Sequence, residues 1–424
     1  MRRVLLGTLL VVVLMIPLAG ARVPGTGLRV ALIALLVPGA LAFLYVLRDR
    51  LWDFASPPLL AAAVFTLSTI VSLPAAANTH AVDLTLMTIA GLGCAAAVVA
   101  VSGPAQIALI LEVFCLVAGV VAAISLSQAG SLTSQLGGSV VSGRLQGLFS
   151  QPNELGGFCA LALPIVLVTA RYTEGRARRV ALWACAVAIT VALALSLSRG
   201  AWLGGLAGLV MVTVLLPDAR RALTWAALAA VTAAAGTAVL PQSQAILAVL
   251  DARVHSVTGG AAQPYDARPQ IWAQALKLAG QHPWLGVGPG GYQSHSQLPA
   301  SGLYAQPPEH AHSIVLTVLA EQGLLGVVAL LAMGAALLAT GARLITRTRT
   351  MDLPATTRVR WTTAAPLAGL SGIAVHGLTD MPLRNPILNV AVWIIFGCAA
   401  SGAFTRRPRA NESAPENAQE EARL

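Results

Sequence analysis

Long apolar runs follow one another almost from the start of this chain, and they constrain its fold more than any other feature. Twelve runs are long enough to be membrane spans: 4–20, 28–47, 57–76, 82–101, 105–126, 154–170, 180–197, 200–217, 222–240, 322–341, 362–379 and 386–404. A helix needs about 20 apolar residues to cross a bilayer. Only 10% of the 424 residues are charged, against about 25% in soluble domains. The sequence therefore predicts an all-α polytopic membrane protein with 12 transmembrane helices and one long structured extracytoplasmic loop.

The positions of the cations predict how the chain crosses the membrane. With twelve spans, 19 of the 27 lysine and arginine residues lie on the side of the two termini and 8 lie on the other side. Positive charge collects on the cytoplasmic side, so we expect a protein of the inner (cytoplasmic) membrane with both termini in the cytoplasm. This topology explains the net charge of +10 without a nucleic-acid partner. A second apolar run follows the first within ten residues, which favours an uncleaved first span over a signal peptide.

Two connections on the extracytoplasmic side, 127–153 and 241–311, are longer than the others. In the second, apolar residues recur at helical spacing over 268–280, which predicts an amphipathic helix. The glycine-rich stretch GVGPGG follows, and it lacks the lysine of a phosphate-binding loop, so we expect its glycines to let the loop fold tightly over another element. We divide the chain into N-terminal helices (1–126), central helices with arginine motifs (127–240), an extracytoplasmic catalytic loop (241–321), C-terminal helices (322–405) and a disordered cytoplasmic tail (406–424).

Three arginines lie on the side with less positive charge: Arg144 before a span, Arg199 between two spans, and Arg268 at the start of the surface helix. An arginine near the end of a span commonly extends to lipid headgroups. Arg199 is the sharpest case, because the short turn that carries it keeps it close to the hydrocarbon. Its guanidinium needs an anionic partner there, and a phosphate can bind it through two hydrogen bonds.

Two histidines, His310 and His312, close the long loop. Residues two apart on a helix point in nearly opposite directions, so the pair could chelate a metal only in an extended chain. No third metal ligand lies near the two histidines in the sequence, and the five cysteines do not occur in the closely spaced pairs of a zinc site. We therefore expect no metal site and no cofactor. A neutral histidine on that face is a candidate general base, while a solvated loop histidine is the plainer alternative. Asp380 follows His376 at i, i+4, either as a structural hydrogen bond or as part of a cavity floor.

The motifs together resemble a known family. The segments GRLQGLFSQPNELGG, SLSRGAWLGGL, RPQIWAQALKLAGQHPWLGVGPGGY, HAHSIVLTVLAEQGLLG and HGLTDMPLRNP look like successive motifs of the O-antigen ligase and polymerase superfamily, over about residues 140–385. Each motif alone is weakly specific, whereas the ordered set of motifs is fairly specific for the family. The sequence departs from the family in Ser313, where asparagine is common, and in the additional His310.

The resemblance implies a membrane glycosyltransferase. Members of the family move a glycan from undecaprenyl pyrophosphate to a sugar acceptor such as lipid A–core, on the outer face of the inner membrane. Carried over by position, the pyrophosphate contacts would be Arg144, Arg199 and Arg268, and the catalytic base would be His312. Supporting residues would be Asn153, Ser198, His310 and Asp380.

Physical chemistry is consistent with this implication. Arginines can stabilise the negative charge that develops on the diphosphate when the glycosidic bond breaks. We therefore expect a metal-independent displacement that inverts the anomeric centre. Two alternatives stay open: a polysaccharide polymerase on the same scaffold, and a transporter or flippase for a lipid-linked glycan, whose arginines would line a passage.

Overall fold

The computed structural model of the chain describes residues 2–20, 26–49, 56–76, 78, 80–101, 103–128, 133–136, 139–142, 144–220, 268–297, 308–348 and 354–402. The predicted span 222–240, the loop segment 241–267 and the tail 406–424 lie outside the described residues.

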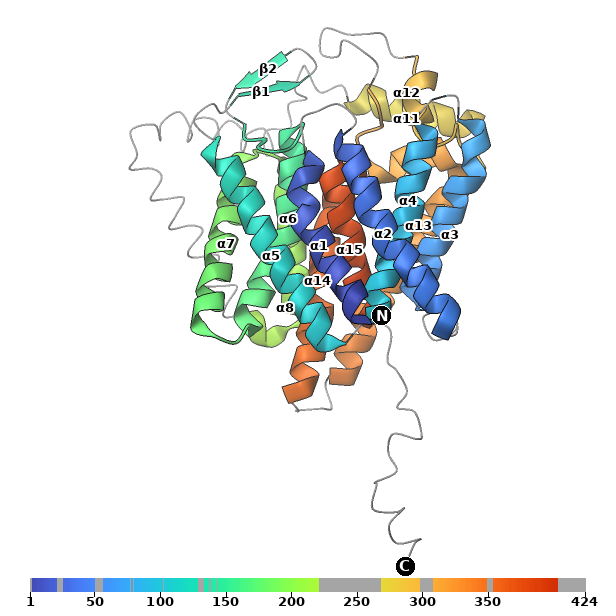
Figure 1. Ribbon diagram of the computed structural model, residues 1–424. Coiled ribbons are helices and arrows are strands. Elements are labelled where there is room, and N and C mark those ends of the chain that lie inside the picture. The colour runs from blue at the N-terminus through green and yellow to red at the C-terminus, as the bar shows by residue number, and fades with distance from the viewer. Residues whose placement is uncertain are drawn as a thin grey trace, which may run out of the picture.

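Long helices run roughly parallel or antiparallel to one another and form one bundle (Figure 1). They are α1 (Arg2–Met15), α2 (Thr26–Asp49), α3 (Pro57–Ser72), α4 (Ala81–Val101), α5 (Pro104–Ser127), α6 (Pro152–Tyr172), α7 (Arg176–Leu195), α8 (Arg199–Leu215), α13 (Ile314–Thr348), α14 (Pro354–His376) and α15 (Pro386–Gly402). Each predicted span other than 222–240 overlaps one of these helices. Among the described residues, seven helices are long and apolar enough to cross a membrane, and three further apolar helices are shorter.

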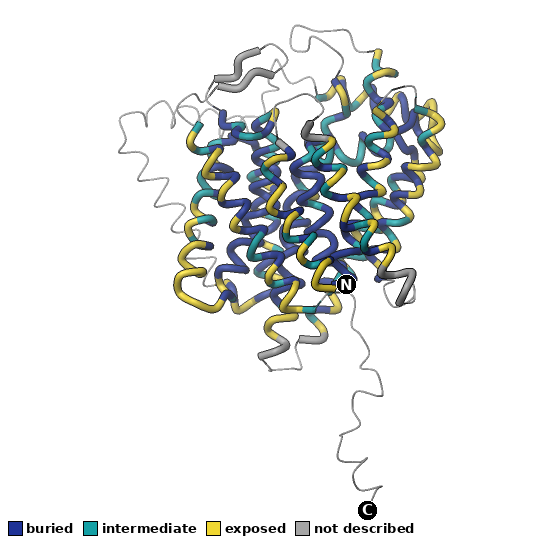
Figure 2. The backbone as a smooth tube through the Cα atoms, in the orientation of Figure 1, coloured by how far each residue is buried: buried dark blue, intermediate teal, exposed yellow. Residues whose placement is uncertain are grey.

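These helices confirm a polytopic helical membrane protein, although they do not establish the count of twelve. Figure 2 shows buried residues concentrated on the central helices and exposed residues on the outward faces. Large apolar side chains such as Leu203, Leu206 and Val210 on α8 are more than half exposed. Such a face would be costly in water and suits contact with lipid.

Small residues bring the central helices close together. A Cβ at Gly204 of α8 would lie 2.5 Å from the carbonyl oxygen of Gly372 in α14, and a Cβ at Gly372 would lie 2.6 Å from the carbonyl oxygen of Ala160 in α6. Membrane helices pack closely where small residues let their backbones approach. As a result, the first turns of α6 and α8 meet the last turn of α14. We call this end of the bundle the motif end.

Two smaller structures lie beyond the helices at the motif end (Figure 1). The amphipathic helix predicted at 268–280 is α11 (Arg268–Gln281), and the short α12 (Gly291–His295) follows it. An antiparallel hairpin of β1 (Thr133–Leu136) and β2 (Ser139–Ser142) occupies part of the other long connection. Apart from this two-stranded hairpin, the described elements are helices, which agrees with the expected all-α class.

The glycine-rich loop packs onto a kink in α13. Gly323 has left-handed backbone (φ 64°) and interrupts the helix, and the freed Leu324 amide donates to the carbonyl of Pro283 at 2.8 Å. The amides of Val287 and Gly288 donate to the carbonyls of Ala320 and Glu321, each at 2.9 Å. A Cβ at Gly286 would lie 2.3 Å from the backbone carbon of Glu321, so only glycine permits this approach. The tight fold expected for GVGPGG is confirmed.

Candidate functional site

The predicted site residues that the motifs supply lie at the motif end. Arg144 precedes α6, Asn153 lies in its first turn, and Ser198 and Arg199 begin α8. Arg268 begins α11, and His310 and His312 precede α13. The tertiary structure thus gathers segments that are far apart in the sequence.

Arg144 is a buried arginine that ties two helices together. Its Nε donates to the carbonyl oxygen of Ser196 at 3.1 Å, and its Nη2 donates to Oδ1 of Asn153 at 2.7 Å. Only 8% of the residue is exposed. These bonds fix the guanidinium at the junction of the α7–α8 turn with α6. They also assign Asn153 a definite role, since it orients Arg144.

Arg199 stands at the amino-terminal end of α8, directly after a strained turn. Leu197 in that turn has left-handed backbone (φ 50°), and Ser198 precedes the helix with extended backbone. The N-terminus of a helix carries partial positive charge and unsatisfied amide donors, so it favours an anion. A cation at this position adds to that field. The turn therefore has the electrostatic character of an anion site.

His312 is paired with a carboxylate. Its Nδ1 lies 3.4 Å from Oδ1 of Asp380, which comes from the segment between α14 and α15. Burial alone would raise the pKa of Asp380, but the hydrogen bond with His312 and the charges of the neighbouring histidines hold that pKa below its usual range. An ionised Asp380 favours the proton on Nδ1 and leaves the lone pair on Nε2. This is the tautomer that a general base needs.

The backbone of His312 is itself unusual. His312 and Leu197 are the two non-glycine residues with positive φ in the part of the chain that the structure describes, and His312 has φ 47°. Left-handed backbone is unfavourable for such residues and is concentrated at functional sites. Ser313 follows His312 and caps α13, because its Oγ accepts the amide of Leu316 at 3.5 Å. Serine and asparagine are both good N-caps, so the departure from the family at Ser313 preserves this function.

His310 supports the turn from the other side. Its Nδ1 accepts the backbone amide of His312 at 3.1 Å, and the two rings lie 4.5 Å apart in an edge-to-face arrangement. Burial is the main cause that lowers the pKa of His310 to about 3, and the charge of His312 acts in the same direction. A neutral His310 therefore accompanies His312 at physiological pH.

His376 is a second histidine on the same carboxylate. Its Nε2 lies 4.0 Å from Oδ2 of Asp380. Its ring is packed against α6 and α8, where a Cβ at Gly157 would lie 2.7 Å from Cδ2 and a Cβ at Gly200 would lie 3.3 Å from Nδ1. Both ring nitrogens are buried, and the backbone of Asn153 and Gly200 interacts with this ring. The i, i+4 spacing does place His376 and Asp380 side by side, but beyond hydrogen-bond distance. Arg268 interacts electrostatically with this histidine, which brings the start of α11 to the same cluster.

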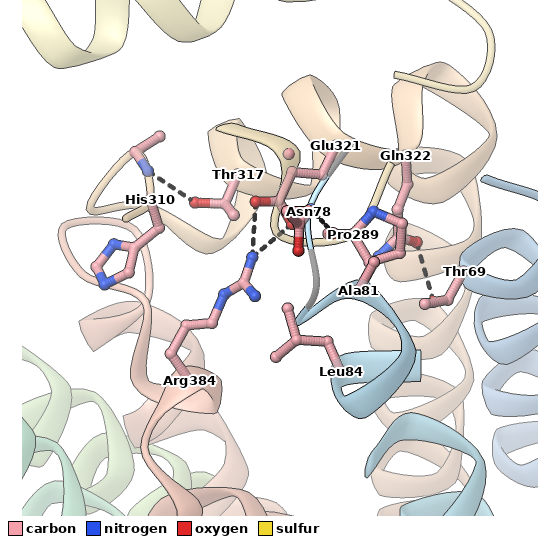
Figure 3. A network of polar contacts seen from close by, with 12 residues as sticks. Thr69, Asn78, Ala81, Leu84, Pro289, His310, Thr317, Glu321, Gln322 and Arg384 are labelled. Carbon is pink, nitrogen blue, oxygen red and sulfur yellow. Dashed lines mark hydrogen bonds and ion pairs between the residues drawn. The ribbon is translucent and has the colours of Figure 1, made fainter. Parts of the chain in front are cut away.

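The sequence did not reveal the ion pair of Glu321 with Arg384. Nη2 of Arg384 donates to both carboxylate oxygens, at 2.6 and 2.5 Å (Figure 3). The side chains are 4% and 15% exposed. The backbone of Gly290 and Tyr292 also bonds to this carboxylate. The pair joins α13, the glycine-rich loop and the segment before α15, and its only sequence signal is a lone carboxylate beside a span.

Glu112, a carboxylate within a predicted span, lies away from the site. It pairs with Arg178 at 3.4 Å near the junction of α6 and α7, at the opposite end of α6 from Asn153. The side chain of Arg178 is 61% exposed. The observed role of Glu112 is thus an ion pair near solvent.

Comparison with known proteins bears on this site directly. Residues 184–331 match the family described as O-Antigen ligase. This match confirms the resemblance to the O-antigen ligase and polymerase superfamily. It includes Arg199, Arg268, His310 and His312, and it ends before Asp380. No curated protein matches the chain.

Proposed function

From the O-antigen ligase match of residues 184–331, we propose that this membrane protein is a ligase-type glycosyltransferase. It moves a glycan from undecaprenyl pyrophosphate to a sugar acceptor of the lipid A–core type. We place the reaction on the extracytoplasmic face of the inner membrane, with both termini in the cytoplasm. The observation that carries the proposal is the pairing of His312 with Asp380 at the same end of the bundle as Arg144, Arg199 and Arg268.

The proposed reaction is a single displacement. Nε2 of His312 takes the proton from the acceptor hydroxyl while that oxygen attacks the anomeric carbon of the donor. The bond from the anomeric carbon to the carrier diphosphate breaks, and the electron pair stays on the diphosphate. The attack comes from the face opposite the leaving group, so the anomeric configuration inverts.

Each basic residue has a separate part in this mechanism. Arg199 and the N-terminus of α8 stabilise the negative charge that develops on the diphosphate. Electrostatic stabilisation of this kind is usually the largest single contribution to catalysis. Arg268 approaches from α11. Arg144 holds the turn before α8 through its bonds to Ser196 and Asn153 and adds positive charge behind it. Asp380 keeps the imidazole of His312 oriented.

The test is glycan transfer by the purified full-length protein in lipid nanodiscs. The donor is an undecaprenyl-pyrophosphate-linked glycan, and three acceptors are compared: lipid A–core, a second carrier-linked glycan, and none. We expect transfer to lipid A–core, with and without EDTA, and loss of transfer in His312→Ala. His295→Ala is the matched control, because His295 lies in α12 and bonds to Gly291 and Ser294.

The outcomes separate the alternatives. Transfer only to the second carrier-linked glycan would identify a polymerase. Movement of the donor across a membrane without a new glycosidic bond would identify a transporter. Full activity of His312→Ala would refute the assignment of the base.

A further inference from the structure

The sequence gives two reasons against a metal site at the histidine pair, and the folded chain removes both. The first is that residues two apart diverge on a helix. However, α13 begins only at Ile314, so His310 and His312 precede it in non-helical backbone with their rings together. The second is the lack of a third ligand nearby. Asp380, 68 residues further along the chain, supplies one.

The three side chains have suitable distances for a common ion. One ligand atom from each of His310, His312 and Asp380 lies within 4.8 Å of the other two. The 3.4 Å between Nδ1 of His312 and Oδ1 of Asp380 is long for a hydrogen bond. It equals the separation of about 3.4 Å between two ligands on a tetrahedral zinc ion, given zinc–ligand bonds of about 2.1 Å.

The surroundings hold these ligands in place. The amide of His312 donates to Nδ1 of His310, so this nitrogen carries the lone pair that an ion would take in place of the hydrogen bond. The amide of Met381 donates to Oδ1 of Asp380 at 2.8 Å. Hydrogen bonds of this kind orient ligands in metal sites.

A second, independent observation concerns the other oxygen of the same carboxylate. Oδ2 of Asp380 is buried without a hydrogen-bond partner among the described residues. A buried carboxylate oxygen without a partner is costly. The charge of Arg384 acts on His310 and is offset by the ion pair with Glu321. Arg384 therefore does not oppose a dication.

We propose that His310, His312 and Asp380 form a binding site for a divalent transition-metal ion of the zinc type, and that the bound ion inhibits glycan transfer. Two imidazoles and one carboxylate favour zinc, cobalt or nickel over magnesium and calcium. Three protein ligands leave a fourth position for water. Binding needs no catalytic assignment, whereas the inhibition rests on the proposed function of His312.

Inhibition follows from the atom that the ion would use. An ion bound at Nδ1 of His312 takes the lone pair that faces Asp380. The ring proton of the neutral imidazole must then be on Nε2, the nitrogen that is proposed to accept the acceptor's proton. His312 is then in the tautomer that cannot act as the base. Transfer therefore proceeds without metal and stops when the ion binds.

Zinc binding is tested first, without activity. Calorimetric titration of the full-length protein in nanodiscs should show one zinc ion per chain, and cobalt should give the absorption spectrum of a four-coordinate ion. His310→Ala and Asp380→Asn should weaken zinc binding by about 10- to 100-fold or more. His295→Ala should leave it unchanged, and magnesium should not compete. Lack of stoichiometric binding, or binding that these two substitutions do not weaken, would overturn the proposal.

Transfer is then measured at increasing zinc concentration, relative to each variant's own rate without zinc. We expect zinc to inhibit, EDTA to restore the rate, and His310→Ala to require about 10- to 100-fold more zinc for the same inhibition. Zinc bound at the three residues without inhibition would overturn the inhibitory part and count against His312 as the base. Activity that is lost in EDTA and restored by zinc would overturn both the inhibition and the metal-independent reaction. Absence of transfer under all conditions would refute the proposed function and leave the binding result intact.

Discussion

Replacing Glu321 with glutamine tests how strongly the buried ion pair holds the motif end together. The substitution keeps the shape of the side chain and removes its charge, so Arg384 is left as a buried cation without its counterion. Removing one partner of a buried pair costs about 3–5 kcal/mol, because the remaining charge stays desolvated. We expect the free energy of unfolding of Glu321→Gln to fall by that amount.

The chain contains its own control. Glu112 pairs with Arg178 at 3.4 Å, and the Arg178 side chain is 61% exposed. Water and salt screen such a pair, so Glu112→Gln should lower the free energy of unfolding by about 1 kcal/mol at most. Replacing Glu321 and Arg384 together by leucine should recover much of the loss, because no buried charge then remains.

The assay is equilibrium unfolding of the purified protein by SDS in mild detergent, followed by tryptophan fluorescence. High salt should reduce the effect of Glu112→Gln further and leave that of Glu321→Gln nearly unchanged. Equal losses for Glu321→Gln and Glu112→Gln would refute the reasoning, since they would mean that burial does not decide the contribution of the pair.

Three further predictions concern the site and the backbone around it. Gly323 has left-handed backbone, and Gly323→Ala would place a Cβ 2.4 Å from the Trp284 backbone, so the free energy of unfolding should fall by about 1–3 kcal/mol in the same assay. Gly334 lies in open space within α13, so Gly334→Ala should raise the free energy of unfolding by up to about 1 kcal/mol. The pKa of His310 falls from 6.5 to about 3 in the folded chain, so this histidine takes up its proton at a higher pH in the unfolded chain than in the folded chain. Stability should therefore decline as pH drops from about 6.5 towards 3, and His310→Gln should remove part of that slope when unfolding is measured across pH. Asp380→Asn should lower kcat by about 10²- to 10⁴-fold with little change in KM for the lipid-linked donor; an equal rise in KM would assign Asp380 to binding instead.

Local sequence was sufficient where structure depends on neighbouring residues. The spans could be located because a backbone in a bilayer must satisfy its hydrogen bonds internally, so apolar length reports a helix. Helix α11 followed from apolar spacing, and the packing of GVGPGG followed from its glycines. Arg199 could be singled out because a short turn between two spans leaves few places for a charge.

The sequence failed where a contact joins distant segments. The i, i+4 spacing placed Asp380 beside His376, but the sequence could not indicate that the same carboxylate faces His312. Glu321 carried no sign of its pairing with Arg384, 63 residues away. The proposed metal site likewise depends on a distant contact, because Asp380 lies 68 residues after His312 in the sequence.

By itself, then, the sequence determined a helical membrane protein, the order of its motifs and the residue types available for chemistry. Those properties depend on hydrophobicity and local backbone preference, which each segment carries alone. The tertiary structure decided which side chains meet. Glycines of α6, α8 and α14 allow these helices to approach closely, and the amide at the start of α13 donates to the carbonyl of Gly377, just after α14. Distances between the imidazoles, the carboxylate and the arginines are set by that packing, and no local pattern encodes them.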